Sequence, residues 1–211
     1  MKSITIELAQ LRAAMLFAAK RDVRYYLNGV FLEIGAGEFR LASTDGHVLS
    51  VQRCEFSTGD AAGMSLIIPD TAIDALKTLK VPSVVLDIDD DGKGGTFRFG
   101  ATSAGFRAVE GRFPDYRRVI PQETSGKAGQ FSAELLMLFH KAAKLLTPRT
   151  KFPLYRVEQN GEDPAVVLLE DPRFVGLLMP RRLKGKDNAD ALTHGYAWSR
   201  GAARHPVAEA A

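Results

Sequence analysis

The sequence has a single cysteine, Cys54, among its 211 residues. One cysteine excludes an internal disulfide and any metal site that needs several thiolate ligands, and it is typical of a protein from a reducing compartment. Long hydrophobic runs are also absent, because none approaches the ~20 residues of a membrane-spanning helix, and the N-terminus lacks the pattern of a signal peptide. We therefore expect a cytoplasmic protein that does not contact a membrane.

Motifs that carry catalysis are scarce. There is no glycine loop of the dinucleotide-binding or Walker type. His47 lies close to Asp45, but no motif places a serine or cysteine nucleophile with them, and Cys54 has no matched histidine. The segment DIDDDGKGGTFR, residues 87–98, begins like a calcium-binding loop, but its twelfth position is Arg98 instead of glutamate. We expect a hairpin turn at this segment, and we expect no enzyme activity, cofactor or metal.

Charge of one sign is in only slight excess. The 28 lysines and arginines exceed the 25 acidic residues by a net charge of +3. So small an excess supports a polyanionic partner only if the cations gather on one surface. The hydrophobic content of 45% and the charged content of 25% are ordinary for a globular chain, so the position of the cations is more informative than their number.

A similar pattern recurs three times along the chain. Each repeat joins a short strand-like run to an amphipathic helix, and the helices are predicted to begin near Glu7, Asp70 and Ala133, about 62 residues apart. Three strand-like runs follow each helix, separated by turn signals such as residues 45–46 and 160–161. Each repeat therefore has the order strand, helix and three antiparallel strands, which predicts an α+β fold. One such unit cannot cover its own sheet, so two or more must pack together.

The repeats define the predicted domain boundaries. Repeat one (1–56) and repeat two (57–121) form one domain, 1–121, and a polar linker at 122–129 leads to repeat three (130–183). The remaining residues, 184–211, are polar and alanine-rich with no sustained periodicity, so we predict a flexible tail.

Residues 111–121, GRFPDYRRVIP, combine three arginines, two aromatic residues and two prolines. Pro114 and Pro121 exclude a helix interior, and the frequent charges leave no dry strand face. Arginines interleaved with aromatic rings suggest a nucleic-acid contact, but they are equally compatible with a well-ordered connector. The segment alone does not separate these two interpretations.

Four stretches resemble signature segments of one family, the bacterial beta sliding clamp, which is the processivity subunit of DNA polymerase III. They are DVRYYLNGVFLE (22–33), STDGHVLS (43–50), EGRFPDYRRVIP (110–121) and MPRRL (179–183), in the order in which the family carries them. Repeats one and two resemble the clamp's middle domain, and repeat three resembles the second half of its last domain. The resemblance thus covers about one and a half clamp domains and ends at Leu183.

The resemblance implies the DNA-clamp fold, with antiparallel sheets outside and helices lining a ring around duplex DNA. It also implies a pocket that receives short peptides from DNA polymerase, clamp-loader and repair proteins. Residues 111–121 then become a connector that Phe113 and Tyr116 anchor while the arginines form local ion pairs. The implied pocket residues are Leu27, Thr44, Gly46, His47, Leu49, Pro121, Leu177, Met179, Pro180 and Arg182. Val48 stands where the family usually has a basic residue, and Arg181 where a hydrophobic one is common.

If the helices line a hole, their exposed faces should be basic. Acidic residues on the three helices lie toward the N-termini, where the helix dipole favours them. Lysines near helix C-termini also complement the dipole, which is the alternative explanation for each single cation. The candidate DNA-binding residues are Arg12, Lys20, Arg21, Lys77, Lys80, Lys141, Lys144 and Arg149.

Helix spacing limits the number of chains in such a ring. With axes roughly 10 Å apart and three helices per chain, two, three or four chains give ring diameters of about 19, 29 or 38 Å. Removing about 10 Å of helix thickness leaves openings of roughly 9, 19 and 28 Å. Only four chains admit a duplex of about 20 Å width. We therefore expect a head-to-tail homotetramer in which repeat three completes a domain with repeat one of the next chain.

Two other classes of function compete with the sliding clamp. A regulatory decoy would bind clamp-binding peptides or the clamp loader without encircling DNA, and it would need neither a ring nor basic helices. An enzyme is disfavoured, because no reactive combination of residues is apparent.

Overall fold

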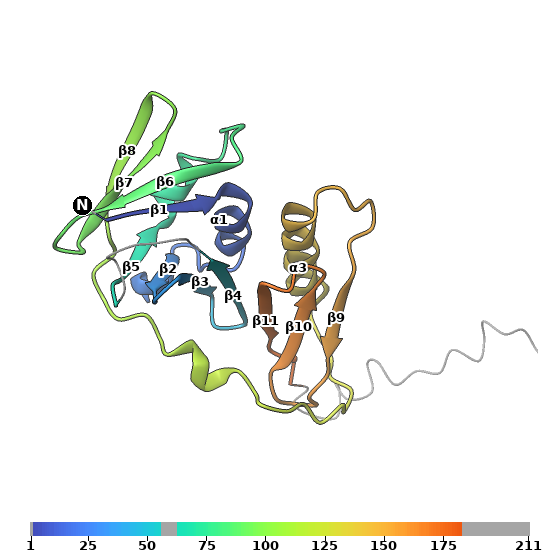
Figure 1. Ribbon diagram of the computed structural model, residues 1–211. Helices are drawn as coiled ribbons and strands as arrows, with labels where there is room; N and C mark the ends of the chain where they lie inside the picture. The colour runs from blue at the N-terminus through green and yellow to red at the C-terminus, as the bar shows by residue number, and fades with distance from the viewer. Residues whose placement is uncertain (1, 56–62, 183–211) are drawn as a thin grey trace, which may run out of the picture. The chain divides into compact units, whose positions relative to one another are not determined.

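Our computed structural model describes residues 2–55 and 63–182 (Figure 1). The described chain forms three blocks, and in each block a helix is followed by three strands. Repeat one contains β1 (Lys2–Glu7), α1 (Leu8–Met15), the 3-10 helix η1 (Tyr25–Leu27), β2 (Gly29–Ile34), β3 (Glu38–Thr44) and β4 (Val48–Glu55). Repeat two contains β5 (Ser65–Pro69), α2 (Asp70–Asp74), β6 (Ser83–Ile88), β7 (Gly94–Phe99), β8 (Thr102–Arg107) and the 3-10 helix η2 (Tyr116–Val119). Repeat three contains α3 (Ala133–Leu146), β9 (Tyr155–Glu158), β10 (Ala165–Leu169) and β11 (Phe174–Leu178).

The three helices begin within one residue of the predicted positions, and nine strands follow them as predicted. Two details differ. Residues 25–27 form a 3-10 turn before β2, and residues 129–131 at the start of repeat three do not form a strand. The predicted tail, 184–211, lies outside the described residues. The compact unit of the fold ends at Arg181.

Helix α2 is much shorter than the apolar stripe of its sequence predicts. After Asp74 the backbone tightens, with the amide of Leu76 donating to the carbonyl of Ile73 at 2.9 Å. The side chain of Arg12 from α1 then reaches this turn, and its Nη2 lies 2.8 Å from the carbonyl oxygens of both Leu76 and Leu79. The carbonyl of Leu76 also accepts from the amide of Leu79 at 3.2 Å, so after Asp74 the chain continues as tight three-residue turns that Arg12 caps, and the α-helix ends.

Repeats one and two exchange strands. Strand β1 of repeat one pairs with β6 of repeat two, in a four-stranded sheet of order β1-β6-β7-β8. In return, β5 of repeat two pairs with β2 of repeat one, at one edge of the second sheet. A shared core of buried aliphatic and aromatic side chains, among them Leu11, Leu32, Leu86 and Phe97, fills the interior. The two repeats therefore form one interlocked domain.

Repeat three extends the sheet of repeat one. Strand β11 pairs antiparallel with β4, which gives a seven-stranded sheet of order β5-β2-β3-β4-β11-β10-β9. We call the contact between β4 and β11 the seam. Repeat one is thus paired with repeats two and three of its own chain. The expectation that repeat three completes a domain with repeat one of the next chain is wrong in this structure.

Aromatic packing holds the seam together on the helix side of the sheet. The Phe17 ring lies 4.9 Å from that of Phe139 on α3 and 5.9 Å from that of Phe174 on β11, measured between ring centres. Gly176 makes this approach possible, because a Cβ atom there would lie only 2.3 Å from Cε1 of Phe139. Arg173 adds a polar tie, because its Nη1 donates to Glu7 of repeat one at 2.8 Å.

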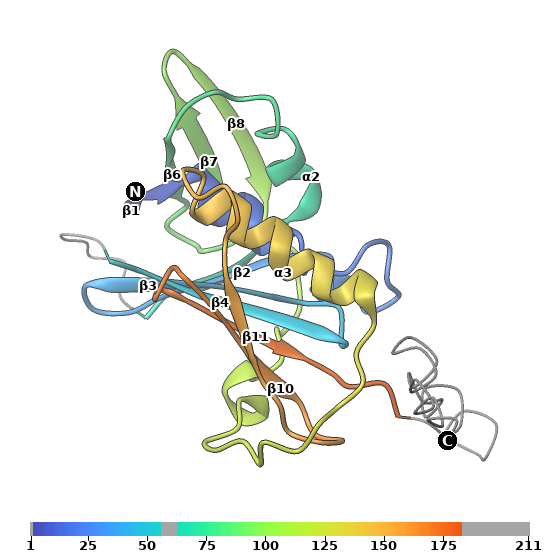
Figure 2. The ribbon, with the colours of Figure 1, turned by 90° about the vertical axis from the view of Figure 1, so that its right-hand side faces the viewer.

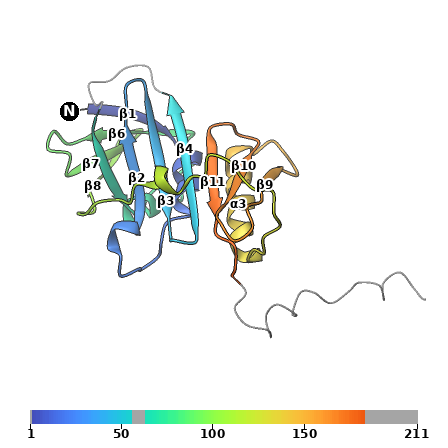
Figure 3. The ribbon, with the colours of Figure 1, turned by 90° about the horizontal axis from the view of Figure 1, so that it is seen from below.

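The helices and the connector, residues 111–121, lie on opposite faces of the seven-stranded sheet. Figure 2 shows α1 and α3 over one face and η2 beneath the other, and Figure 3 shows the connector crossing β3, β4 and β11. No helix in the described ranges is both long and apolar enough to span a bilayer. Within the same ranges no three histidine, cysteine or acidic side chains gather into a metal-binding cluster.

Candidate functional site

A cavity of about 340 Å³ lies over the seam on the connector side of the sheet. We call it the pocket. It is lined by Arg24, Leu27, Thr44, Gly46, His47, Val48, Leu49, Phe113, Pro114, Asp115, Tyr116, Val119, Pro164, Leu177 and Met179. The structure thus brings together seven of the ten residues that the resemblance implied, namely Leu27, Thr44, Gly46, His47, Leu49, Leu177 and Met179.

The floor of the pocket is apolar and depends on the seam. Leu49 of β4 lies directly opposite Leu177 of β11 in the strand register, and both are buried together with Leu27. Phe113 and Tyr116 belong to the same buried cluster and form a wall from the connector side. The pocket floor therefore exists only where repeats one and three meet.

The rim of the pocket is a tight turn between β3 and β4. The amide of Gly46 donates to Thr44 Oγ1 at 3.0 Å, and Asp45 Oδ1 accepts from the amides of His47 at 2.7 Å and Val48 at 2.9 Å. Gly46 has a φ of 96°, a left-handed conformation that glycine adopts without strain. The carbonyl of His47 in turn accepts from the amide of Met179 at 2.9 Å, so the rim is tied to the segment after β11.

Arg24 supplies a cation at the rim that the sequence analysis missed. Its Nη2 donates to the carbonyl of Asp45 at 3.0 Å and to Asp22 Oδ2 at 2.7 Å. The side-chain hydrogen bond from Arg24 lowers the pKa of Asp22 to about 2. A Cβ atom at Gly46 would lie 3.2 Å from Nη1 of Arg24, so the glycine also makes room for this side chain.

Three of the implied pocket residues do not line the cavity. Pro121 and Pro180 are half-buried and lie outside its lining, and Arg182 follows the last residue of the compact unit. Val48 contributes to the lining but is buried in the helix-side cluster that includes Phe17. The position where the family usually has a basic residue is thus filled by an aliphatic side chain that packs into the seam.

Arg181, the other departure from the family pattern, is exposed. Its backbone amide donates to the carbonyl of Gln130 at 2.7 Å. This bond ties the segment after β11 to the start of repeat three, and it does not depend on the identity of the side chain.

Phe113 and Tyr116 anchor the connector, as the resemblance implied, and Arg117 supplies an ion pair. The Phe113 ring stacks on Phe31 with 4.9 Å between the ring centres and 1° between the planes. Tyr116 donates from its hydroxyl to Glu33 Oε2 at 2.9 Å, and Arg117 forms a bidentate ion pair with the same carboxylate. The hydrogen bonds from Arg117 and then Tyr116 lower the pKa of Glu33, although its partial burial opposes the shift. Burial, followed by the bond to Glu33, raises the pKa of Tyr116 to about 12.

Sequence reasoning assigned the connector to chain geometry and overlooked its place in the pocket. Five of its residues, Phe113, Pro114, Asp115, Tyr116 and Val119, line the cavity. The sequence did carry a signal for this role. The segment is rich in aromatic residues, and it ends at Pro121, the one connector residue that the resemblance placed at the pocket.

A second cavity, of about 760 Å³, lies on the helix side and collects part of the predicted DNA-binding set. We call it the basic groove. Arg12, Lys20, Arg21 and Lys77 line it together with Leu145 of α3, and Asp70 and Asp74 are its carboxylates. Lys80, Lys141, Lys144 and Arg149 are exposed but do not line the groove.

Two of the cations in the groove already have protein partners. Arg12 is half-buried and bonds the carbonyls at the end of α2, so its contribution to the fold is structural. Lys77 pairs with Asp74 at 2.6 Å, one helical turn away, although both side chains remain exposed. Lys20 and Arg21, just after α1, are exposed, and Arg21 has a φ of 55°. Besides Lys77, the exposed cations of the predicted set are therefore Lys20 and Arg21 in the groove and Lys80, Lys141, Lys144 and Arg149 outside it.

Interlocked strand-helix-three-strand repeats, with helices on one face and a pocket over the seam on the other, define a protein of the DNA-clamp fold class. Residues 5–115 match the family model of the DNA polymerase III beta subunit, central domain. This match covers more than half of the chain. The chain therefore belongs to the family of bacterial DNA polymerase III beta subunits, the beta sliding clamps.

Two relatives in sequence support the same assignment. The beta sliding clamp of Vibrio cholerae is 36% identical over 147 residues, which is 68% of this chain and 39% of that protein. The beta sliding clamp of Escherichia coli K12 is 34% identical over 114 residues, or 53% of this chain and 31% of that protein. The match thus spans well under half of the length of either relative.

Solved structures share the fold. The Caulobacter crescentus beta sliding clamp superposes with a TM-score of 0.67 and 20% identity, covering 86% of this chain and 65% of that one. The DNA polymerase III subunit beta from Pseudomonas aeruginosa gives a TM-score of 0.64 and 19% identity, with 86% and 66% covered. The clamp fold thus extends beyond the matched central domain into repeat three.

Proposed function

We propose that the chain is a noncatalytic cytoplasmic DNA sliding clamp, which encircles duplex DNA as a homo-oligomeric ring and tethers polymerase or repair proteins through the pocket. The observation that carries the proposal is the pocket itself, because seven residues predicted from the resemblance converge on one cavity. No cofactor is needed for this function, since a clamp holds its partners by contact and performs no chemistry.

The chemistry of the pocket suits a short hydrophobic peptide. Leu27, Leu49 and Leu177 offer a buried apolar floor, and Met179 is a deformable side chain that adapts to different apolar residues. Thr44, His47 and Arg24 give polar contacts at the rim, where the peptide backbone would emerge. The floor would bury one or two apolar side chains of the peptide, and polar contacts at the rim would fix the orientation of the peptide backbone.

The experiment is fluorescence anisotropy with a labelled peptide from the clamp-binding tail of a DNA polymerase. We expect saturable binding that Met179→Lys weakens at least about tenfold, because a cation at the apolar wall must be desolvated. The control is Thr102→Lys, at an exposed position on β8. This strand is an edge of the four-stranded sheet, whereas the pocket lies over the seven-stranded sheet, so the variant should bind the peptide as the wild type does. Absence of saturable binding by the wild type would refute the tethering role.

The DNA-binding surface is proposed on the helix side, on Arg12, Lys20, Arg21, Lys77, Lys80, Lys141, Lys144 and Arg149. Contacts with phosphates alone predict binding that is independent of sequence and steeply weakened by salt. Replacing Lys77, Lys80, Lys141 and Lys144 by glutamate should abolish retention on circular DNA. The control carries the same change in charge elsewhere, with glutamate at the exposed positions Arg53, Lys93, Arg107 and Arg118. Equal loss in both variants would show that only net charge matters.

The ring is proposed to contain four chains, from the spacing of helices around a duplex. The alternative, a decoy that binds clamp-binding peptides or the clamp loader without encircling DNA, keeps the pocket and needs no ring. Mass by light scattering at micromolar concentration, with and without DNA, separates the two. A strict monomer under both conditions, combined with peptide binding, would favour the decoy.

A further inference from the structure

A third cavity, of about 640 Å³, lies beside β5 on the connector side of the seven-stranded sheet. We call it the cationic cavity. The turn between β6 and β7, the end of β8 and the start of the connector line it together with Phe31 of β2. None of its charged residues lines the pocket or the basic groove, so the proposed function leaves this cavity without a role.

The lining of the cationic cavity has an excess of positive charge. Lys93, Arg107 and Arg112 line it together with a single carboxylate, Glu110, so three cations and one acid give a net charge of +2. All four residues are exposed. In the described part of the chain, no ion pair or side-chain hydrogen bond occupies any of the three cations. Cations that have no partner within the chain are available to an anionic ligand.

Other arginines on the connector side of the sheet are already paired. Glu33 holds Arg117, and Asp22 holds Arg24 at 2.7 Å. The charges in the lining of the pocket also balance, because Arg24 and Asp115 contribute one of each sign. Acidic residues of a ligand would therefore be attracted to the cationic cavity and not to the pocket.

The cationic cavity and the pocket share one wall and one buried cluster. Phe113 lines both cavities, and Ile67 of the cationic cavity belongs to the same cluster as Leu49 and Leu177 of the pocket floor. Strands β5 and β4 are three strand spacings apart in the sheet order, which is about 15 Å. An extended peptide covers this distance with about five residues, so one peptide can reach both cavities.

A free strand edge favours a peptide over a nucleic acid as the ligand. The amide of Ile34 on β2 donates to the carbonyl of Met64 at 2.9 Å, so the backbone of the next residue, Ser65, points away from β2. Within the described ranges, no strand pairs with that side of β5. An extended peptide can hydrogen-bond to such an edge through its own amides and carbonyls, whereas a nucleic-acid backbone has none. The cavity also lies on the opposite face from the helices on which DNA binding is proposed.

We propose that the cationic cavity binds an acidic segment that flanks the apolar residues of a clamp-binding peptide. Carboxylates of this segment bind Lys93, Arg107 and Arg112, about five residues away from the side chains that the pocket buries. The assignment rests on the proposed function of the pocket and adds a charge preference to it. Partners with an acidic flank are then bound more tightly than partners without one.

Fluorescence anisotropy with extended peptides tests this preference. The labelled peptide from the clamp-binding tail of a DNA polymerase is extended by a glycine-serine spacer of about five residues and three glutamates, at its N-terminus in one probe and at its C-terminus in another. Matched probes carry three glutamines instead. One of the two glutamate probes should bind about tenfold more tightly than its glutamine counterpart, because several exposed ion pairs add together. Added salt should reduce this difference.

Removal of the cations tests whether the gain arises in the cationic cavity. The variant with Lys93→Gln, Arg107→Gln and Arg112→Gln should bind both kinds of probe with the affinity that the wild type has for the glutamine probe. Unchanged binding of the glutamine probe also shows that the variant is folded and that its pocket is intact.

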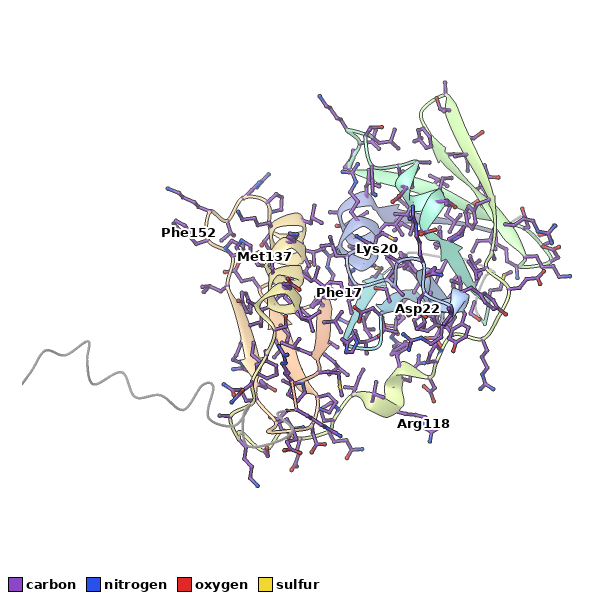
Figure 4. All side chains as sticks on the ribbon, turned by 180° about the vertical axis from the view of Figure 1, so that it is seen from behind. Phe17, Lys20, Asp22, Arg118, Met137 and Phe152 are labelled. Atoms are coloured by element: carbon purple, nitrogen blue, oxygen red, sulfur yellow. The ribbon has the colours of Figure 1, made fainter. Side chains whose placement is uncertain are left out.

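A matched control removes three exposed cations outside both cavities, with Arg53→Gln, Arg118→Gln and Lys151→Gln. Figure 4 shows Arg118 pointing outward from the connector. This control variant has the same net charge as the cavity variant, and it should keep the tenfold difference between the glutamate and glutamine probes.

The outcomes separate the acidic flank from the function of the pocket. Equal binding of glutamate and glutamine probes by the wild type, at both termini, would overturn the acidic flank and leave peptide binding by the pocket intact. A difference that persists in the cavity variant would also overturn it. Failure of every probe to bind would refute the pocket function and the flank together. Tighter binding of a labelled oligothymidylate than of the glutamate probes, lost in the cavity variant, would assign the cavity to nucleic acid instead.

Discussion

Two contacts between repeats differ in how deeply the chain is interlocked. Repeats one and two exchange strands in both directions and share a core of aliphatic and aromatic side chains. Repeats one and three meet through one strand pair, three phenylalanine rings and the tie between Arg173 and Glu7. The pocket lies over the second contact. The interlocked contact thus provides a rigid scaffold, and the simpler seam provides the concave surface on which a binding site can form.

The largest effect is expected in the interlocked core. Phe97 on β7 is fully buried there, so Phe97→Ala leaves a cavity and should lower the free energy of unfolding by about 3–5 kcal/mol. Urea denaturation followed by circular dichroism measures this change. Phe152→Ala, at an exposed ring, should change it by less than about 0.5 kcal/mol. A loss of the same size at both positions would contradict the assigned core.

A smaller and more local effect is expected at the seam. Gly176→Ala forces a methyl group against Phe139, and overpacking of this kind costs about 1–3 kcal/mol. Hydrogen exchange should accelerate in β11 while β6 and β7 stay protected, because the interlocked domain does not depend on repeat three. Gly105→Ala on β8 is the control, since the nearest atom to its added Cβ is 3.7 Å away. Equal acceleration of hydrogen exchange in β6, β7 and β11 would mean that the interlocked domain and the seam unfold together.

The anchor of the connector predicts a pH dependence on the acid side. Hydrogen bonds from Arg117 and Tyr116 hold the pKa of Glu33 below its usual range. The stabilisation is therefore complete above the ordinary carboxyl pKa and is lost as the pH falls through the lowered value. Glu33→Gln should remove this slope and cost at most about 1 kcal/mol at neutral pH, because the ion pair is partly exposed. Unfolding curves between about pH 3 and pH 7 compare the two proteins.

The smallest effect concerns the Tyr116 phenol, whose pKa is raised to about 12 by burial and by the bond to Glu33. A raised pKa favours the neutral form in the fold. Its contribution is thus complete below the ordinary tyrosine pKa and is lost as the pH rises toward 12. Phenolate absorbance should show one of the five tyrosines titrating late in the wild type. Tyr116→Phe should lack this late step, and its persistence would assign the step elsewhere.

Local pattern predicted most of the secondary structure. The starts of α1, α2 and α3 follow from apolar spacing and from the turn residues before them, which act over a few neighbouring positions. The length of α2 was not predictable in this way, because its end depends on Arg12, a residue far away in the sequence. The same limit applies to the docking of repeat three. Sequence pattern showed that it needs a neighbour, but only the structure shows that β4 of the same chain is that neighbour.

The pocket was predictable from resemblance and less so from physical pattern. Leu49 and Leu177 occupy ordinary strand positions, and nothing in their local sequence indicates that they lie opposite each other. Phe113 and Tyr116 were recognised as anchors, but their place in the pocket wall depends on the path of the connector across the seam. Side chains that meet only in the folded chain leave little trace in a single sequence.

The pairing of Leu49 with Leu177 has a consequence for the order of events during synthesis. One half of the pocket floor is made early in translation, and the other half belongs to β11, the last described strand. A growing chain that has not yet released β11 from the ribosome has no floor on which a peptide can rest. A ligand that rests on this floor must therefore wait until the final strand has folded.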